Sequence, residues 1–464
     1  MFYCRKKELA EMNRLYLNNK FECVIIYGRR RIGKTALINE FCKNKKTIFF
    51  SALNATANEN LESLSKAIYV TENNDYEKAP IYQNFDAALN KIGSLGKDNR
   101  IVFVIDEYPY LAKSDTSFSS RLQHIIDHKW QNSKIYLILC GSSMNFMENQ
   151  VLGYESPLYG RRTAQFKIKA LNYREITEFN KNLNYEQQAL IYGITGGIPH
   201  YINKLNVRKN IDEALLNNFF NTSSYLFEEP ENLLKQELRE PAVYNSIIYA
   251  IANGYSHLNE IATKIGLETG LCIKYIKVLI DLGIIKKETP ITEKNGRKTI
   301  YIFEDNFFRF WYKFVPQNFT AINSCNISKI YKQVIKKYLS DYMGFVFEKM
   351  CREYLLYYVK KLPMDLVDIG QWWGTDNKEK KEIQIDIVGS SLNKDEYIIG
   401  SCKYTNKIIG VEEFELLKKY SEMFAKGKKY HFFMFSKNGF NKNLIKLAKE
   451  EKINLITLED MYRV

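Results

Sequence analysis

The segment that most constrains the fold of this chain is residues 24–41, VIIYGRRRIGKTALINEF. Gly28, four further residues and then Gly33-Lys34-Thr35 have the spacing of the Walker A phosphate-binding loop. The apolar run before the loop predicts a buried strand, and the residues after it predict the start of a helix. Glycines let backbone N–H groups turn toward phosphate oxygens, and the helix offers its positive N-terminus to the same anion. The alternative, an ordinary glycine-rich turn, is disfavoured because both flanks have the required pattern.

Residues within this loop have distinct expected roles. Lys34 would contact the β- and γ-phosphates of ATP, and the hydroxyl of Thr35 would contact Mg²⁺. Only the backbone of the loop is required for phosphate binding, so its three arginines are variable positions. We expect their side chains to point to solvent, although they could add to the cationic field. The predicted nucleotide-contacting positions are Gly28, Arg29, Arg30, Arg31, Ile32, Gly33, Lys34, Thr35 and Ala36.

Two further apolar runs predict strands that end in polar residues. Residues 101–105 (IVFVI) are followed by Asp106 and Glu107, and a continuous apolar run is typical of a strand buried on both faces of a parallel sheet. Asp106 would orient Mg²⁺, and Glu107 would act as general base toward the attacking water. Residues 135–140 (IYLILC) are followed by Gly-Ser-Ser. There Ser142 would sense the γ-phosphate or hold the water, unless it only caps a helix.

Arg161 and Arg162 follow Gly160 and have three possible roles. Either guanidinium could neutralise charge on the transferred phosphoryl group, in cis or from a neighbouring subunit. Either could instead bind DNA or form a structural ion pair. The sequence leaves these three alternatives open.

The composition constrains the compartment and the partners. The chain has 464 residues, with 67 Lys and Arg against 53 Asp and Glu, a formal net charge of +14. Such an excess of cations suggests an acidic partner, with nucleic acid as the first candidate, although solvation by lysine is an alternative. The eight cysteines include no C-x-x-C pair and several lie in apolar runs, which favours reduced thiols. No run approaches the length of a membrane span, so we expect a cytoplasmic protein that does not contact membranes.

The middle of the chain predicts a winged helix-turn-helix. Three amphipathic patterns at residues 241–253, 257–266 and 269–282 precede a strand-like run at 283–287. The Asn295-Gly296 pair is a strong hairpin signal, Arg297 follows it, and residues 300–303 (IYIF) close the hairpin. In DNA-binding versions the third helix enters the major groove and the wing touches phosphate. Contact with a protein partner is the alternative for this module.

The C-terminal region contains a helix and a hairpin that carry polar residues. Residues 341–360 read as an amphipathic helix that carries Glu348. Strands at 383–388 and 397–404 with a turn at Asn393-Lys394 form an antiparallel pair, in which Asp386 lies across from Ser401 and Lys403 is on the same face. A slip of one residue would separate them onto opposite faces.

The first part of the chain resembles the archaeal-type ATPases, a P-loop group close to the AAA+ and STAND NTPases. The resemblance rests on Arg5, Glu8-Leu9, Gly28 to Thr35, Asp106-Glu107, Gly141-Ser142-Ser143, Gly160-Arg161-Arg162 and Gly196-Gly197-Ile198-Pro199. It implies ATP and Mg²⁺ as cofactors. The Gly-Gly-Ile-Pro segment reads locally as a helix stop followed by a helix start. In related ATPases it belongs to a helical lid that approaches the nucleotide, so the resemblance implies Pro199 as a lid contact. Cys4 stands where the family often has glycine.

The C-terminal region resembles the restriction-endonuclease-like PD-(D/E)xK domains that follow many archaeal-type ATPases. Glu348, Asp386 and Lys403 match the helix Glu, the strand Asp and the Lys of that pattern, whereas Ser401 fills the position of the second strand's carboxylate. The resemblance implies that Glu348 and Asp386 hold Mg²⁺ with waters and substrate phosphate, while Lys403 positions the water. A serine cannot supply the missing negative charge, so the alternative is a degenerate nuclease fold that binds DNA or a partner.

The sequence thus predicts an α/β protein with a P-loop parallel sheet, a helical lid, a winged helix-turn-helix and a nuclease-like domain. The expected boundaries are 1–170 for the ATPase core, 171–225 for the lid, 226–315 for the winged helix, 316–340 for a linker and 341–464 for the nuclease-like domain. The expected function is a DNA-associated ATPase that couples its nucleotide state to these domains, with a homo-oligomer as one open alternative for its assembly. The alternative is a nucleotide-gated regulatory or scaffold protein whose inactive nuclease-like domain binds protein partners.

Overall fold

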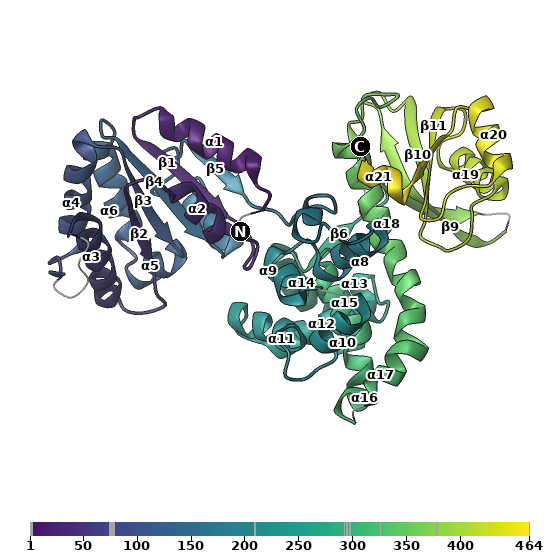
Figure 1. The fold of residues 1–464 in the computed structure, drawn as a ribbon, viewed down its shortest axis with the longest axis horizontal. Coiled ribbons are helices and arrows are strands. Elements are labelled where there is room, and N and C mark those ends of the chain that lie inside the picture. The colour runs from purple at the N-terminus through teal and green to yellow at the C-terminus, as the bar shows by residue number, and fades with distance from the viewer. Residues whose placement is uncertain are drawn as a thin grey trace. The chain divides into compact units, whose positions relative to one another are not determined.

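A computed structural model of the chain shows two compact units (Figure 1). The structure describes residues 3–73, 79–207, 210–291, 293, 296, 298–324, 326–376 and 379–463. The first unit comprises residues 1–170 and 198–200, and the second comprises 171–197 and 201–464. Across the described ranges, no helix has both the length and the apolar composition needed to cross a membrane.

The first unit is built on a five-stranded sheet in the order β2-β3-β4-β1-β5, and every neighbouring pair is parallel. The three central strands are buried along their whole length, as their continuous apolar sequences predict. The strands are β1 (Glu22–Tyr27), β2 (Thr47–Ser51), β3 (Ile101–Asp106), β4 (Ile135–Gly141) and β5 (Ala164–Lys167).

Helices cover both faces of this sheet because alternate strand residues point to opposite sides. Val24 and Ile26 pack with Leu37 and Phe41 of α2 and with Met12 of α1. The intervening strand residues face a larger core made with α3 to α6 (Figure 1). The helices are α1 (Lys6–Leu17), α2 (Lys34–Cys42), α3 (Ala57–Asn73), α4 (Phe85–Asp98), α5 (Tyr108–Ser114), α6 (Phe118–Ile125) and the single turn α7 (Met144–Phe146), with π-helical turns at Ile126–Trp130 and Met147–Val151.

The second unit begins with helices. They are a 3₁₀ turn at Glu175–Phe179, α8 (Tyr185–Thr195), α9 (Pro199–Leu205), whose first two residues belong to the first unit, α10 (Ile211–Phe219) and α11 (Tyr225–Glu237). Helix α8 has an Asn184–Gln187 capping box at its start and ends at Gly196, whose φ is 63°. Gly197 follows with φ 71°, so the chain turns sharply between α8 and α9.

Three helices and a two-stranded antiparallel sheet follow, in the order that the winged-helix pattern predicts. They are α12 (Pro241–Ala252), α13 (Leu258–Ile265), α14 (Thr269–Asp281), β6 (Ile285–Glu288) and β7 (Ile300–Phe303). Two residues of the expected wing, Asn295 and Arg297, lie outside the described residues. Lys274 and Lys277 are exposed on α14.

Further helices lead to the C-terminal sheet. They are α15 (Asn306–Phe314), α16 (Phe319–Asn323), α17 (Ile327–Ile330) and α18 (Lys336–Tyr357), with short turns at Pro316–Asn318 and Tyr331–Ile335. Most of the described residues of 316–340, expected as a linker, are thus helical. The division of the second unit into lid, winged helix and nuclease-like domain stays a prediction.

The C-terminal sheet has the order β12-β11-β10-β9-β8, antiparallel from β8 to β10 and parallel from β10 to β12. Its elements are β8 (Asp368–Asp376), β9 (Lys381–Ser390), β10 (Glu396–Lys403), α19 (Val411–Phe424), β11 (Lys429–Ser436), α20 (Lys442–Glu450), β12 (Asn454–Thr457) and α21 (Leu458–Arg463). Helices α19 and α20 cover one face (Figure 1). Strand β8, which contains Trp372 and Trp373, was not predicted.

Two glycines with the same backbone conformation provide a stability test. Gly197 and Gly266 both have φ 71°, but a Cβ on Gly197 would lie 1.9 Å from the carbonyl oxygen of Leu171, whereas one on Gly266 would meet nothing within 4 Å. Alanine in this conformation costs about 1–2 kcal/mol, and a forced overlap adds about 1–3 kcal/mol. We expect Gly197→Ala to lower the midpoint of thermal unfolding clearly more than Gly266→Ala. Equal losses would contradict the close approach.

Candidate functional site

The loop between β1 and α2 has the conformation that its glycines predict. Gly28 has φ 154°, and a Cβ there would lie 2.4 Å from the carbonyl oxygen of Ile168. Gly33 has φ 94° and forms the N-cap of α2. The backbone amides of the first turn of α2 therefore face the loop, which is the arrangement that binds anions.

Lys34 lies inside this loop. Its side chain is 6% exposed, and its Nζ donates to the carbonyl oxygens of Gly28 at 2.8 Å and of Arg29 at 3.0 Å. Burial lowers the pKa of Lys34, while the carboxylates of Asp106 and Glu107 oppose that effect. The ammonium group is thus held by neutral carbonyls at the place where a phosphate would compete for it.

The acidic pair Asp106-Glu107, at the end of β3, lies beside the loop. Thr35 Oγ1 donates to Asp106 Oδ2 at 3.0 Å, so a hydroxyl and a carboxylate meet at the start of α2. Ser142, directly after β4, donates from Oγ to Glu107 Oε2 at 2.9 Å. Glu107 itself has φ 52°, a left-handed conformation that is uncommon for a residue with a side chain. Such strain is frequent at functional sites.

The loop arginines differ from the expectation. Arg29, Arg30 and Arg31 are half-buried rather than fully exposed, and Arg30 donates to the hydroxyl of Tyr110 at 2.8 Å. The expectation that all three side chains point to solvent is therefore wrong, because α5 runs beside the loop and supplies a partner. Ile32 is 4% exposed, so it anchors the loop in the core, whereas Ala36 is exposed.

Pro199 lies next to the loop within the same unit. Its Cγ is 3.8 Å from the position that a Cβ on Gly33 would occupy. This nearness agrees with the lid contact that the resemblance implies. A contact of Pro199 with the nucleotide stays a prediction.

The two arginines after β4 have different surroundings. Arg161 forms a two-pronged ion pair with Asp127, from Nε at 3.0 Å and from Nη2 at 2.8 Å. The hydrogen bonds from Arg161 lower the pKa of Asp127. Arg162 is exposed. Of the three alternatives, the structural ion pair is therefore observed for Arg161.

The C-terminal sheet has the predicted register. Strand β9 pairs with β10 from Tyr397↔Ser390 to Gly400↔Ile387, so the next position of this register sets Asp386 opposite Ser401. The backbone N–H of Cys402 donates to Asp386 Oδ2 at 2.8 Å. The pairing of β8 with β9 shifts between Gly370 and Trp372, which inserts a bulge beside Asp386. Bulges of this kind re-aim side chains and are common next to active sites.

Glu348 of α18 lies near Asp386. Gln371, at the shifted position of β8, donates to Glu348 Oε2. Burial raises the pKa of Glu348 to about 8, and the charge of Asp386 adds to the shift. Burial also raises the pKa of Asp386, against the attraction of Lys403. The structure thus brings together the three residues that the sequence selected.

Sequence reasoning missed a fourth residue, Glu413 of α19. Ser401 Oγ donates to Glu413 Oε1 at 2.9 Å, and Lys403 Nζ lies 3.0 Å from the same oxygen. Glu413 thus brings a carboxylate to the place where Ser401 lacks one. Acidic residues in the first turn of a helix are common because they complement the helix dipole, so the sequence carried no specific signal.

The described residues contain no group of three or more His, Cys, Asp and Glu side chains arranged to hold a metal ion by themselves. Mg²⁺ is often held by one or two carboxylates together with waters and substrate phosphate. The donor chemistry of Asp386 with either Glu348 or Glu413 fits this second type of site.

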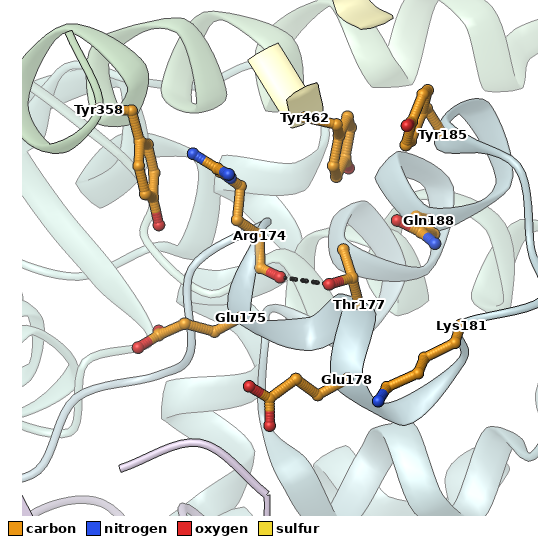
Figure 2. Close-up of a pocket in the computed structure, with 9 residues that line it drawn as sticks. All are labelled: Arg174, Glu175, Thr177, Glu178, Lys181, Tyr185, Gln188, Tyr358 and Tyr462. Carbon is orange, nitrogen blue, oxygen red and sulfur yellow. Dashed lines mark hydrogen bonds between the residues drawn. The ribbon is translucent and has the colours of Figure 1, made fainter. Parts of the chain in front are cut away.

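A polar cleft of about 540 Å³ lies elsewhere in the second unit (Figure 2). Arg174 stacks on the ring of Tyr358 at 4.4 Å, and Tyr185 stacks on Tyr462 with ring centroids 5.0 Å apart. Glu175, Glu178 and Lys181 line the remainder. Its two cations and two carboxylates balance, so its charge selects no ligand.

The parallel sheet, the loop at Lys34 and the acidic pair after β3 define a P-loop ATPase fold. Residues 2–205 match a family described as an ATPase domain predominantly from Archaea, and residues 311–419 match a family of archaeal and bacterial proteins of unknown function. An uncharacterized protein of Methanocaldococcus jannaschii is 33% identical over 430 residues, which cover 89% of this chain and 94% of that protein. The chain belongs to this family of archaeal-type ATPases.

Two further proteins are similar to parts of the chain. An uncharacterized ATP-binding protein of Methanocaldococcus jannaschii is 52% identical over 46 residues, covering 10% of this chain and 78% of that protein. A Walker-type ATPase of Pyrococcus abyssi superposes with a TM-score of 0.51 at 17% identity, covering 67% of this chain and 96% of that chain. The latter match shows a shared fold.

The Arg161–Asp127 pair is open to a double-mutant test. In denaturant unfolding, Arg161→Ala, Asp127→Ala and the double variant should show a coupling of about 0.5–1 kcal/mol at pH 7, because the pair is half-exposed. The pKa of Asp127 is lowered in the folded state, so the stabilisation holds above the unfolded pKa of about 4 and is lost as pH falls further. The control is Arg162→Ala, whose effect on the free energy of unfolding should simply add to that of Asp127→Ala. Zero coupling between Arg161 and Asp127 would contradict a structural role for their ion pair.

Proposed function

We propose that the chain binds ATP at the loop between β1 and α2 and hydrolyses it with Mg²⁺. The observation that carries this proposal is the pairing of Thr35 with Asp106 at 3.0 Å and of Ser142 with Glu107 at 2.9 Å, beside the buried Lys34. The first pair joins the start of α2 to the end of β3, and the second joins the residues that directly follow β4 and β3. The donor set of a hydroxyl and a carboxylate suits Mg²⁺.

In this mechanism each residue of the site has a separate role. Lys34 would exchange its carbonyl partners for phosphate oxygens, and Thr35 and Asp106 would hold Mg²⁺. When bound, Mg²⁺ supplies positive charge against that of the phosphates. Glu107 would accept the proton of the attacking water, and Ser142 would fix the orientation of the Glu107 carboxylate. Arg162, which is exposed, is available for a neighbouring subunit.

We further propose that the chain associates with DNA through its second unit. The net charge of +14, and the exposed Lys274 and Lys277 on the third helix of the winged-helix-like module, support this. The rival proposal is a regulatory protein whose nucleotide state gates a protein partner. Salt-sensitive DNA binding would favour the first, and tight association with a protein in the absence of DNA affinity would favour the second.

ATP hydrolysis by the purified full chain tests the first proposal. We expect Glu107→Gln to bind ATP but to lower kcat by about 10²–10⁴-fold, because the general base is lost. Lys34→Ala should abolish both nucleotide binding and hydrolysis. Lys43→Ala is the matched control, since Lys43 lies directly after the same helix and is exposed. Phosphate release and the binding of a fluorescent ATP analogue provide the measurements. Unchanged hydrolysis in Glu107→Gln would refute its assignment as base.

A second candidate function, metal-dependent cleavage of nucleic acid, is favoured by Glu413. Its contacts with Ser401 and Lys403 bring a third carboxylate toward Asp386 and Glu348. Asp386 with one of the two glutamates, together with waters and substrate phosphate, would hold Mg²⁺, and Lys403 would position the water that attacks a phosphodiester. Without Glu413, Ser401 would leave the site one negative charge short.

The test of this candidate combines metal binding with plasmid nicking. We expect Glu413→Gln to weaken Mn²⁺ binding about tenfold or more by calorimetry, and nicking to fall with it. Adding Ser401→Asp to that variant should recover both, because the carboxylate returns at the neighbouring position. Glu412→Gln, one residue earlier on the same helix turn, is the matched control. If nicking is absent in the native protein and in Asp386→Ala alike, the domain is a nuclease-shaped binding module.

A further inference from the structure

A cavity of about 520 Å³ lies in the second unit, next to Glu348. Its walls come from the β6–β7 hairpin, from α15, from α18 and from the β8–β9 pair. The residues that matter for its chemistry are Asn306, Arg309, Arg352, Gln371 and Trp373. The cavity therefore joins the winged-helix-like module to the candidate nuclease-like site.

Four cations and three carboxylates, those of Glu304, Glu348 and Glu382, line the cavity, and two of the cations have close carboxylate partners. Lys349 pairs with Glu304 at 2.8 Å, and Lys286 pairs with Glu288 at 2.9 Å. Arg309, by contrast, forms no hydrogen bond or ion pair through its guanidinium with any residue that the structure describes. It lies over the ring of Phe345 at 4.0 Å, and burial lowers its pKa. The carboxylates of Glu348 and Glu288 act on this guanidinium through space, but no hydrogen bond joins either of them to it.

Two further donor atoms in the lining have no hydrogen-bond acceptor. Arg352 Nη1 is buried without a hydrogen bond, since its nearest carboxylate oxygen, on Glu288, is 4.0 Å away. The Nδ2 of Asn306 also has no partner, in a side chain that is 4% exposed. Buried donors without acceptors are rare in folded proteins and call for an explanation. Three donors around one cavity point to a ligand that is rich in acceptor oxygens, and phosphate is that ligand in its most common form.

The lining also includes an aromatic side chain. Trp373 of β8 pairs with Gln384 of β9, and both residues line the cavity. Bases of single-stranded nucleic acid stack on such rings irrespective of sequence. A cavity of this size is typical of sites for one small molecule, so it accommodates a flexible strand one nucleotide at a time and excludes a duplex.

We propose that this cavity binds a single strand of nucleic acid, with a phosphate on Arg309 and Arg352 and its base against Trp373. The bound strand would pass Glu348, which lines the same cavity, so the β6–β7 hairpin would form one side of the entrance to the nuclease-like site. This inference deepens the proposed cleavage function and rests on it for its biological purpose. Strand binding itself can be measured without cleavage.

The test is fluorescence anisotropy of the full chain with labelled 20-nucleotide single-stranded DNA, single-stranded RNA and duplex DNA, in EDTA so that no strand is cut. We expect single strands to bind more tightly than the duplex, and the DNA and RNA arms identify the natural strand. Arg309→Gln should weaken single-strand binding tenfold or more. It should also reduce the slope of log affinity against log salt by about 0.7, the loss of one phosphate contact.

Trp373→Leu is the second variant, since it keeps an apolar side chain and all charges. We expect it to weaken binding about fivefold or more, as loss of base stacking does, with the salt slope unchanged. Lys274→Gln with Lys277→Gln on α14 is the control for binding at the outer face of the winged-helix-like module. Circular dichroism and ATP hydrolysis, measured on each variant, show that it is folded and that the first unit is intact.

Several outcomes would overturn the proposal. One is single-strand binding that survives in both Arg309→Gln and Trp373→Leu but is lost in the α14 variant, which would place the strand on α14. Others are a preference for duplex, or no binding of any strand. The proposed ATPase function would stand in each of these cases, because its readout is separate. If the protein nicks plasmid but its binding of single strands does not depend on Arg309, the cleavage function stands. Only the proposal that the strand binds in this cavity is then refuted.

Discussion

The order of the parallel strands is the constraint on which the nucleotide site depends. Strand β4 lies between β3 and β1, so the loops after these three strands open at one edge of the sheet. This places Ser142 against Glu107, and Asp106 against Thr35, within hydrogen-bond distance. In open parallel sheets the ligand-binding crevice lies at this carboxyl edge. The residues that would bind and cleave ATP are therefore positioned by the backbone pairing of the core strands. They lie at the ends of these strands or in the segments that directly follow them.

Helix α18 plays the corresponding part in the second unit. Its Tyr342 donates to the carbonyl oxygens of Gly193 on α8 and Asn306 on α15, and Lys349 pairs with Glu304 beside α15. The opposite side of the helix lies against β10 through Cys351 and Cys402. Buried polar contacts of this kind fix orientation because each partner would be costly to leave unpaired. Glu348 is thereby fixed relative to both the C-terminal sheet and the cavity that opens toward the β6–β7 hairpin.

The sequence predicted the features that follow from backbone rules. The P-loop conformation follows from two glycines at fixed spacing, and the β9–β10 register follows from the position of one turn, which sets every cross-strand pair by arithmetic. The roles of the site residues remain predictions. The sequence did not predict strand β8, because Trp372 and Trp373 lie in a segment whose alternation is broken by the shift at Gln371. Nor did it reveal the partner of Arg161 or the half-burial of the loop arginines. Those depend on Asp127 and Tyr110, which approach through tertiary packing and carry no local signal.

Ser401 and Glu413 show why a motif can misrepresent the charge of a site. The small side chain of Ser401 occupies little space on its strand, and its hydroxyl donates to a carboxylate that arrives from α19. Lys403 then faces the Glu413 carboxylate at 3.0 Å, and Asp386 and Glu413 together raise its pKa against the opposing effect of burial. The pair of carboxylates beside Lys403 therefore comes from two different elements, β9 and α19. Because charge acts through space, the number of carboxylates around the lysine describes this site better than their order along the strand.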